Sequence, residues 1–406
     1  MYRLEKANNG ANVKANSANG QNLEDLMSFA SQQVVLLLIA LISAVLVTFP
    51  YLIYPIVLGA MRQIPIERRS MTTAGEQFAL LFCAYNEIAS LDAKLRNVES
   101  LKTLYPQLEV LVYDDGSTDG TAELLRKRPD LVTLVHGEGR RGKAYGMKTL
   151  VSLTSREFLI FTDANVILDE AAPSALYAYF QDPQVGGVCG HLEYLYQSET
   201  ATERAGGRYW TIEETIKFRE SATGNVMGGD GSIFSVRRNL YPTFQDTVQD
   251  DFTVTMSVVF AGSRLIYADD VIAYERLVSK PRDEFRRKIR IAARAYHTHL
   301  QFKLGRRRMS ARDRFKYASH KILRWWGGLF SLIATAALIT MVGNVSVLAA
   351  VVLGCAVVVV LYSGPRLGSY VGLFAEIWRA MIATLIGVML ALAGRTFATW
   401  TPPKSR

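Results

Sequence analysis

The chain has 406 residues, half of them hydrophobic, and a formal net charge of +9 at pH 7. Its three cysteines, Cys83, Cys189 and Cys355, are odd in number and widely spaced, which excludes a disulfide framework and a cysteine zinc site. The positive charge is concentrated between residues 276 and 324, directly before an apolar region. We therefore expect the basic block to face anionic lipid headgroups rather than nucleic acid.

The first 60 residues divide into a polar and an apolar segment. Residues 1–32 are rich in Asn and Ala and predict a mobile tail, without the cleavage pattern of a signal peptide. Residues 33–60 carry no charge and are long enough for a transmembrane helix, which takes ~20 apolar residues. Pro50 and Pro55 should kink this span or end it early. The positive-inside rule places the following side in the cytoplasm, because it carries Arg62, Arg68 and Arg69.

Residues 61–275 predict a soluble α/β domain. Strands are expected at 78–83, 110–113, 131–135 and 158–162. Helices are expected between them at 89–104, 121–127 and 143–153. Thr118 or Asp119 is available to cap the second helix. Strands that alternate with helices indicate a mostly parallel sheet, and such sheets place ligands at the carboxyl ends of their strands.

The last third of the chain combines basic and apolar sequence. Residues 276–324 predict basic helices at the membrane interface. Residues 325–400 predict three more transmembrane helices, near 326–342, 345–362 and 377–392. Arg366 and Arg379 favour a cytoplasmic loop before the third of these. Four spans place the amino terminus outside, the α/β domain inside, and the carboxyl terminus, with a tail at 401–406, outside.

Two acidic turns at strand ends are the most informative pattern in the α/β domain. Asp114 and Asp115 follow one strand, and Asp163 to Asn165 follow another about fifty residues later. A carboxylate in the first turn can accept hydrogen bonds from a nucleobase or ribose; an Asx turn used only for its geometry is the alternative. Oxygen ligands in the second turn suit Mg²⁺ or Mn²⁺ held together with phosphate.

Two further loops carry weaker signals on the same side of the domain. The turn formed by Ala84, Tyr85, Asn86 and Glu87 could contact a nucleobase or ribose, or cap the next helix. Residues 139–143, which end in Lys143, form a glycine-rich basic loop before a helix. This loop suits a diphosphate or is simply solvated, and it lacks the spacing of a Walker P-loop.

Two charged pairs later in the chain also have both a structural and a functional interpretation. Asp250 and Asp251 stand at a predicted helix start, where they complement the helix dipole or supply a general base. Arg287 and Arg290 are three residues apart and share a helix face. They could bind a pyrophosphate or a lipid phosphate, or form a solvated face.

In their order along the chain, these motifs resemble those of the membrane-bound, inverting glycosyltransferases of family 2. That group includes cellulose, chitin and hyaluronan synthases and many bacterial exopolysaccharide enzymes. The resemblance covers residues 78–295 and implies an α/β, GT-A (Rossmann-like) cytoplasmic catalytic domain with flanking transmembrane helices in the inner membrane. It implies a nucleoside-diphosphate sugar as donor, with uridine as the family default, and Mg²⁺ or Mn²⁺ as cofactor. The implied acceptor is a hydroxyl of a glycan or glycolipid, and polysaccharide-export proteins or a second copy of the chain are implied partners.

The resemblance also assigns roles to the motif residues. It assigns nucleotide-sugar binding to Ala84, Tyr85, Asn86, Glu87, Asp114, Asp115 and Asp163. Asp163 and Asn165 match the metal motif, and Asp251 matches the catalytic base. The acceptor side comprises Gly229, Asp230, Gly231 and Asp250. Charge on the leaving diphosphate would be offset by Lys143, Arg287 and Arg290.

Three departures from the family pattern affect this reading. Asn165 replaces the second metal-motif aspartate, which removes a charge from the cation site. Asp250 replaces the usual Glu, a mild change. Ile291 stands where processive synthases carry Trp, which favours transfer of one sugar per encounter. Two alternatives stay open: transfer to a polyprenyl phosphate carrier, and a membrane-tethered sugar-nucleotide sensor or assembly subunit.

Overall fold

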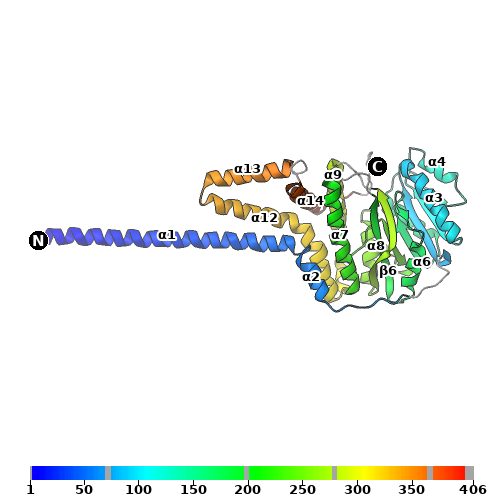
Figure 1. The fold of residues 1–406 in the computed structure, drawn as a ribbon, viewed down its shortest axis with the longest axis horizontal. Helices are drawn as coiled ribbons and strands as arrows, with labels where there is room; N and C mark the ends of the chain where they lie inside the picture. The colour runs from blue at the N-terminus through cyan, green and yellow to red at the C-terminus, as the bar shows by residue number, and fades with distance from the viewer. Residues whose placement is uncertain (1, 69–74, 196–200, 277–280, 364–368, 398–406) are drawn as a thin grey trace.

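The structure is a computed structural model of the chain. It describes residues 2–68, 75–195, 201–276, 281–363 and 369–397. Within these ranges the protein consists of an α/β domain and a set of long apolar helices that lie on one side of it (Figure 1).

An eight-stranded sheet in the order β3-β2-β1-β4-β7-β6-β8-β5 forms the centre of the domain. Its first half is parallel, with β1 paired to β2 and β4, and β2 paired to β3. Strands β1 to β4 span Phe78–Ala84, Glu109–Asp114, Thr133–His136 and Phe158–Thr162. The second half is mixed, because β7 runs antiparallel to both β4 and β6, while β6 and β8 are parallel. Strands β5 to β8 span Ile167–Leu168, Val185–Leu195, Ile233–Arg237 and Arg264–Arg276.

Helices cover both faces of the sheet and bury two separate apolar cores. On one face lie α3, α4 and α6, which span Ile88–Leu104, Thr121–Arg126 and Ala172–Phe180. On the other lie α5, α8 and α9, which span Lys143–Leu153, Asp250–Phe260 and Pro281–Gln301. Helix α7, Ala201–Ala222, packs on β8. The second core also takes up Trp325 and Val388 from the apolar helices, so the domain and those helices share one interior.

The predicted strands and helices of the nucleotide half are all present, with ends that differ by at most a few residues. The expected capping of α4 is right in part, because Asp119 accepts the N–H of Thr121, the first residue of the helix, but does not occupy the N-cap position. Gly120, with a φ of 99°, occupies the N-cap position, and no side chain caps the helix there. Asp119 also accepts the N–H of Ile88, which ties α4 to the start of α3. The expectation of a mostly parallel sheet is right for β1 to β4 and wrong for the mixed second half.

Two helices form the amino-terminal region, α1 from Tyr2 to Thr48 and α2 from Ile53 to Ala60. The interruption at residues 49–52 contains Pro50, as predicted, whereas Pro55 lies within the first turn of α2, where proline is tolerated. The polar segment, predicted as a separate tail, instead continues the helix of the apolar span back to Tyr2. This follows because extending an existing helix needs no new nucleation and the segment contains no proline.

Three more helices, α12, α13 and α14, span Leu323–Gly343, Val347–Ser363 and Ser369–Leu392. Helix α12 packs along α1, and both α13 and α14 pack against α12 (Figure 1). Within the described residues, three helical stretches are long and apolar enough to cross a membrane: Glu24–Thr48, Ala311–Gly343 and Phe374–Leu392. The apolar part of α13, Val347–Tyr362, is shorter than these. The expected tail at 401–406 lies outside the described residues.

The boundary expected between interfacial and transmembrane helices, at residues 324 and 325, falls inside one continuous helical stretch. Helix α11, Ala311–Tyr317, leads through a π-helical segment, Ala318–Ile322, directly into α12. Helix α10 spans Lys303–Arg308. Part of the basic block also faces the domain, since Arg294 and Arg312 donate hydrogen bonds to the carbonyls of Val248 and Thr223.

Candidate active site

Charged side chains converge where the carboxyl end of β4 meets the first residues of α5 and α8. The ammonium of Lys143 lies 2.6 Å from Asp163 Oδ1 and 3.7 Å from Asp250 Oδ2. Gly231 closes the group, because a Cβ added there would lie 3.0 Å from Lys143 Nζ and 3.2 Å from Asp251 Oδ2. Any larger residue at this position would therefore fill the space between base, lysine and metal-motif aspartate. We call Lys143, Asp163, Asp250 and Asp251 the catalytic cluster.

The cluster sets the protonation of its members. Burial, reinforced by the charge of Asp250, raises the pKa of Asp251 to about 7, while Lys143 opposes this rise. Burial alone would lower the pKa of Lys143, but the carboxylates of Asp163, Asp250 and Asp251 raise it above its usual range. Asp251 also accepts the N–H of Phe252 at 2.6 Å, which fixes its orientation. A carboxylate whose pKa lies near neutral pH is suited to general-base catalysis.

Arg294 on α9 belongs to this region and was not singled out in the sequence. Its guanidinium donates to the carbonyl of Val248 at 3.0 Å and lies 3.8 Å from Asp250 Oδ1. The periodicity of α9 could have identified it, because it follows Arg290 by four residues and Arg287 by seven. Arg287 and Arg290 are partly exposed on α9. A contact of theirs with a diphosphate stays a prediction.

The three loops of the nucleotide half are joined by their side chains into one surface. Asn86 has a positive φ of 52°, and its Oδ1 accepts the N–H of Thr118 at 2.8 Å. Asp115 accepts the N–H groups of Arg141 and Gly142, at 2.7 and 3.0 Å. Asp114 has no exposed surface; it lies 2.9 Å from His136 Nδ1 and accepts the N–H of Ser117.

Both aspartates of the first acidic turn are thus engaged in shaping these loops, in agreement with the structural alternative. Their direct contact with a nucleoside stays a prediction. The rim of the same surface carries two stacked pairs that the sequence did not indicate. Arg140 lies over the ring of Tyr85 at 3.7 Å, and Arg141 over that of Tyr145 at 3.6 Å. Flat cationic and aromatic groups of this kind are suited to stacking against a nucleobase.

The metal motif gives a partial fit to a divalent cation. Asp163 has a side chain 39% exposed, with one oxygen directed to Lys143. The amide nitrogen of Asn165 donates to Glu275 Oε1 on β8 at 2.8 Å, so this half of the side-chain amide is already engaged in a hydrogen bond. No group of three His, Cys, Asp or Glu side chains suited to a metal occurs within the described ranges. The residues present fit Mg²⁺ or Mn²⁺ in the way such cations are often held, by one or two carboxylates plus phosphate oxygens.

Two side chains of α3 hold the backbone that follows the metal motif, at residues 166–168. The fully buried Lys94 donates to the carbonyl of Val166 at 2.6 Å. Asn97 donates to the carbonyl of Leu168 and accepts that residue's N–H, at 2.7 and 2.9 Å. Burial lowers the pKa of Lys94 to about 7, while the charge of Asp163 opposes this effect. The loop is therefore held by an unusual buried lysine that the sequence analysis did not identify.

Three of the four acceptor-side residues, Gly229, Asp230 and Gly231, lie in the loop between α7 and β7, whereas Asp250 begins α8. Asp230 pairs with Lys217 of α7 at 2.6 Å. Burial acts against the charge of Asp230, but Lys217 outweighs it and holds the pKa of Asp230 below its usual value. The N–H of Gly229 donates to Thr255 Oγ1 at 3.0 Å. The loop is thereby fixed to α7 on one side and to α8, the helix of the predicted base, on the other.

Residues 80–243 match the profile of Glycosyl transferase family 2. A poly-beta-1,6-N-acetyl-D-glucosamine synthase from Staphylococcus aureus (strain COL) is 28% identical over 200 residues, which are 47% of this chain and 48% of the relative. The same-named protein of Staphylococcus epidermidis is 28% identical over 188 residues, covering 44% and 45%. The chain thus aligns with about half the length of these curated relatives.

A solved structure extends the similarity to most of the fold. It is that of a mannosyltransferase from Pyrobaculum calidifontis in complex with GDP-Man and Mn²⁺. The TM-score is 0.69 at 23% sequence identity, with 89% of this chain and 99% of the other covered. At this identity the similarity establishes the fold, a GT-A-type mixed sheet with flanking apolar helices.

Proposed function

Because residues 80–243 match the profile of Glycosyl transferase family 2, we propose that the chain is a membrane-bound, inverting glycosyltransferase of that family. It would transfer a sugar from a nucleoside-diphosphate sugar to a hydroxyl of a glycan or glycolipid. One observation carries the proposal: Asp251, with a pKa raised to about 7, meets Lys143 and Asp163 around the backbone of Gly231. A base, a cation and a metal-motif carboxylate in one place are the groups that such a transfer needs.

In the proposed mechanism Asp251 removes the proton of the acceptor hydroxyl. The acceptor oxygen attacks the anomeric carbon, and the bond from that carbon to the diphosphate oxygen breaks. Its electron pair leaves with the nucleoside diphosphate, so that one bond forms and one breaks at the anomeric carbon, whose configuration inverts, while the acceptor proton stays on Asp251. Asp250 and Lys143 set the proton affinity of Asp251, as their opposite effects on its pKa indicate. General-base assistance is typically worth ~10²–10⁴ in rate.

The remaining site residues would bind and orient the donor. We propose that the loops of Asn86, Asp114 and Asp115 hold the nucleoside. Lys143, Arg287 and Arg290 would balance charge on the departing diphosphate. Asp163, with Asn165 if its carbonyl oxygen is available, would hold Mg²⁺ or Mn²⁺. When bound, that cation would neutralise negative charge that develops on the leaving group.

The relatives support a specific donor and a cellular setting. Those from Staphylococcus are named as synthases of poly-beta-1,6-N-acetyl-D-glucosamine, so we propose N-acetylglucosamine, carried by UDP, as the transferred sugar. Three apolar helical stretches of sufficient length support an integral protein of the plasma membrane. The arginines after α2 support a cytoplasmic catalytic domain.

The test is a donor screen on the detergent-solubilised full chain. UDP-N-acetylglucosamine and GDP-mannose are supplied with Mg²⁺, Mn²⁺ or EDTA and a short β-1,6-linked N-acetylglucosamine acceptor, and released nucleoside diphosphate is measured. We expect metal-dependent release from the UDP donor, lost in Asp251→Asn. The control is Asp246→Asn, a nearby carboxylate that pairs with Lys148 outside the cluster.

Other outcomes favour the alternatives. Turnover that survives Asp251→Asn with a polyprenyl phosphate would indicate an acceptor that is already ionised and needs no base. Binding of a donor without turnover under every condition would favour the sensor or assembly subunit.

A further inference from the structure

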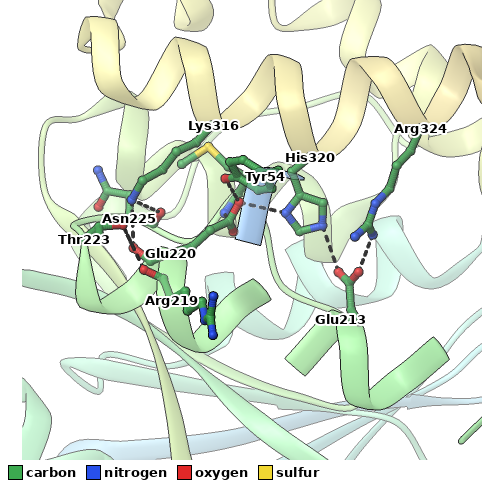
Figure 2. Close-up of polar contacts among 10 residues, drawn as sticks. Tyr54, Glu213, Arg219, Glu220, Thr223, Asn225, Lys316, His320 and Arg324 are labelled. Atoms are coloured by element: carbon green, nitrogen blue, oxygen red, sulfur yellow. Dashed lines mark hydrogen bonds and ion pairs between the residues drawn. The ribbon is translucent and has the colours of Figure 1, made fainter. Parts of the chain in front are cut away.

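A buried network of charged side chains joins the catalytic domain to the apolar helices (Figure 2). Glu213 and Glu220, two turns apart on α7, face His320 of the π-helical segment that leads into α12. His320 Nδ1 lies 2.8 Å from Glu220 Oε1, and its Nε2 lies 3.0 Å from Glu213 Oε1. Arg324 donates to the other oxygen of Glu213, and Tyr54 of α2 donates to Glu220 at 2.6 Å. We call these five residues the junction network.

The geometry assigns the charge of His320. A neutral imidazole has one N–H, and its second nitrogen would then direct a lone pair at a carboxylate oxygen. Since both ring nitrogens face carboxylates, both must donate, and His320 is an imidazolium. Its side chain and that of Glu220 have no exposed surface. A buried ion pair is costly unless every partner is satisfied, and removal of one partner leaves an uncompensated charge.

Lys316 extends the network along α11. Its ammonium donates to the carbonyls of Glu220 and Asn225, at 2.8 and 3.2 Å. Around the two carboxylates lie the cations His320, Lys316 and Arg324. Burial would raise the pKa of Glu220, but the charges of His320 and Lys316 outweigh it and hold this pKa below its usual value. The carboxylate is therefore ionised and fully paired.

The network reaches the catalytic cluster through one short loop. The second carboxylate oxygen of Glu220, Oε2, accepts the N–H of Met227 at 2.9 Å. One residue later Gly228 has a φ of 101°, and a Cβ there would lie 2.7 Å from the ring of Phe252, beside the predicted base. The loop then continues to Gly231, which closes the cluster. Glu220 thus holds Met227 in this loop, and at Gly231 the same loop lies directly against the cluster.

We propose that His320, Glu220 and Tyr54 are positioning residues for glycosyl transfer, which set the acceptor-side loop at residues 225–231 from the helices that enter the membrane. The proposal rests on the proposed function of the cluster. A rotation of α12 relative to α7 would move His320 away from at least one carboxylate. The released Glu220 would then no longer hold the loop, so the acceptor side of the site would depend on the arrangement of the membrane helices.

The test compares His320→Gln and Tyr54→Phe with the wild-type full chain in detergent. Glutamine cannot donate to both carboxylates and carries no charge, whereas Tyr54→Phe removes one hydroxyl and should fold normally. Hydrogen exchange followed by mass spectrometry should be about 10-fold faster for residues 225–231 in His320→Gln. It should be about 2- to 10-fold faster in Tyr54→Phe, the effect of one hydrogen bond. Exchange in the loops at 114–120 and 139–142 should not change.

Kinetics supply the second readout. The kcat of His320→Gln should fall about 10- to 100-fold, as expected when a reacting group is slightly misplaced. The KM for the donor should stay within about twofold, because the donor loops are not attached to the network. The control is Ser331→Ala, which also removes one hydroxyl on α12, the acceptor for Trp378 Nε1, but is not joined to the loop.

Three results would overturn the proposal. They are unchanged exchange at residues 225–231 in both variants, faster exchange spread over the whole domain in both, and a loosened loop with unchanged kcat. The exchange measurement requires no turnover. An inactive wild type would therefore count against the proposed function, while the loop measurement would still decide whether the network positions residues 225–231.

Discussion

Replacement of Asp251 by Asn separates the chemical role of this residue from its structural one. Asparagine keeps the oxygen that accepts the N–H of Phe252 and removes only the ability to take a proton. Transfer should fall by ~10²–10⁴, the usual value of a general base, while the affinity for the donor stays nearly unchanged. In the wild type, kcat/KM should rise with pH to a plateau above about 7, where Asp251 is ionised.

The same substitution should stabilise the protein. The pKa of Asp251 rises from the ordinary 3.8 to about 7, mainly through burial and the charge of Asp250. At about 1.4 kcal/mol per pKa unit, ionised Asp251 costs the folded state at most about 4 kcal/mol, and about 2 kcal/mol is reasonable for a partly exposed side chain. Between pH 4 and 7 the folded state binds more protons than the unfolded state, so the wild type loses stability as the pH rises through this window.

The assay is thermal unfolding of the full chain in detergent at pH 5, 6, 7 and 8. The melting temperature of Asp251→Asn should exceed that of the wild type by a few degrees at pH 8, and the difference should shrink towards pH 5. Donor binding is followed by calorimetry in parallel. A variant that is less stable than the wild type at pH 8, or that loses donor binding together with activity, would refute the reasoning and indicate a structural role.

Three other substitutions test the surroundings of the cluster. Lys143→Met removes the cation that lowers the pKa of Asp251, so the rate should fall and the rising limb of the pH–rate profile should shift to higher pH. The control is Lys148→Met, further along α5, which should leave the profile unchanged; an unchanged profile in Lys143→Met would contradict the reasoning. Asn165→Asp loses the hydrogen bond to Glu275 and sets two carboxylates together, so the melting temperature should drop and recover when Glu275→Gln is added. If residue 165 contacts the cation, half-saturation should need less Mn²⁺ in the double variant, and an unchanged requirement would count against that contact. For Lys94, whose pKa falls from 10.5 to about 7, the unfolded state binds more protons between these values. The wild type should therefore gain stability relative to Lys94→Met, by up to about 4 kcal/mol, as the pH rises from 7 to 10; unfolding curves with no such trend would show that burial does not lower the pKa of Lys94.

The nucleotide half of the fold could be predicted because local pattern and tertiary structure agree there. Short apolar runs ending at Asp114 and Asp163 alternate with helical segments, and each run became a buried parallel strand. The acceptor half could not be predicted in the same way. Its strands β6 and β8 are long and irregular, with register shifts around Cys189 and His191, and β7 joins them from the opposite direction. Strand order of this kind depends on long-range pairing, which leaves no periodic signal in the sequence.

The site shows the same division. Carboxylates after strands and at a helix start were visible as motifs, and the structure brings Asp163, Asp250 and Asp251 together around Lys143. Residues that act from a neighbouring element were missed, because a single arginine or lysine in a helix resembles a solvated one. Arg294 and Lys94 are the two examples, and burial alone distinguishes them from their exposed neighbours. The polar first part of α1 was predicted as a tail for another reason, since composition does not report whether a neighbouring helix extends into the segment.

The charges of the cluster explain why its parts depend on one another. With Asp251 ionised, the carboxylates of Asp163, Asp250 and Asp251 exceed the cations Lys143 and Arg294 by one. A donor diphosphate would add to this negative excess, so a divalent cation is the natural counter-charge, and the partly exposed Asp163 can hold it. Proton transfer to Asp251 removes the excess at the moment when charge moves onto the leaving group. Asp251, Lys143 and the metal-motif Asp163 therefore depend on one another, because a change of charge on one changes the charge that the others face.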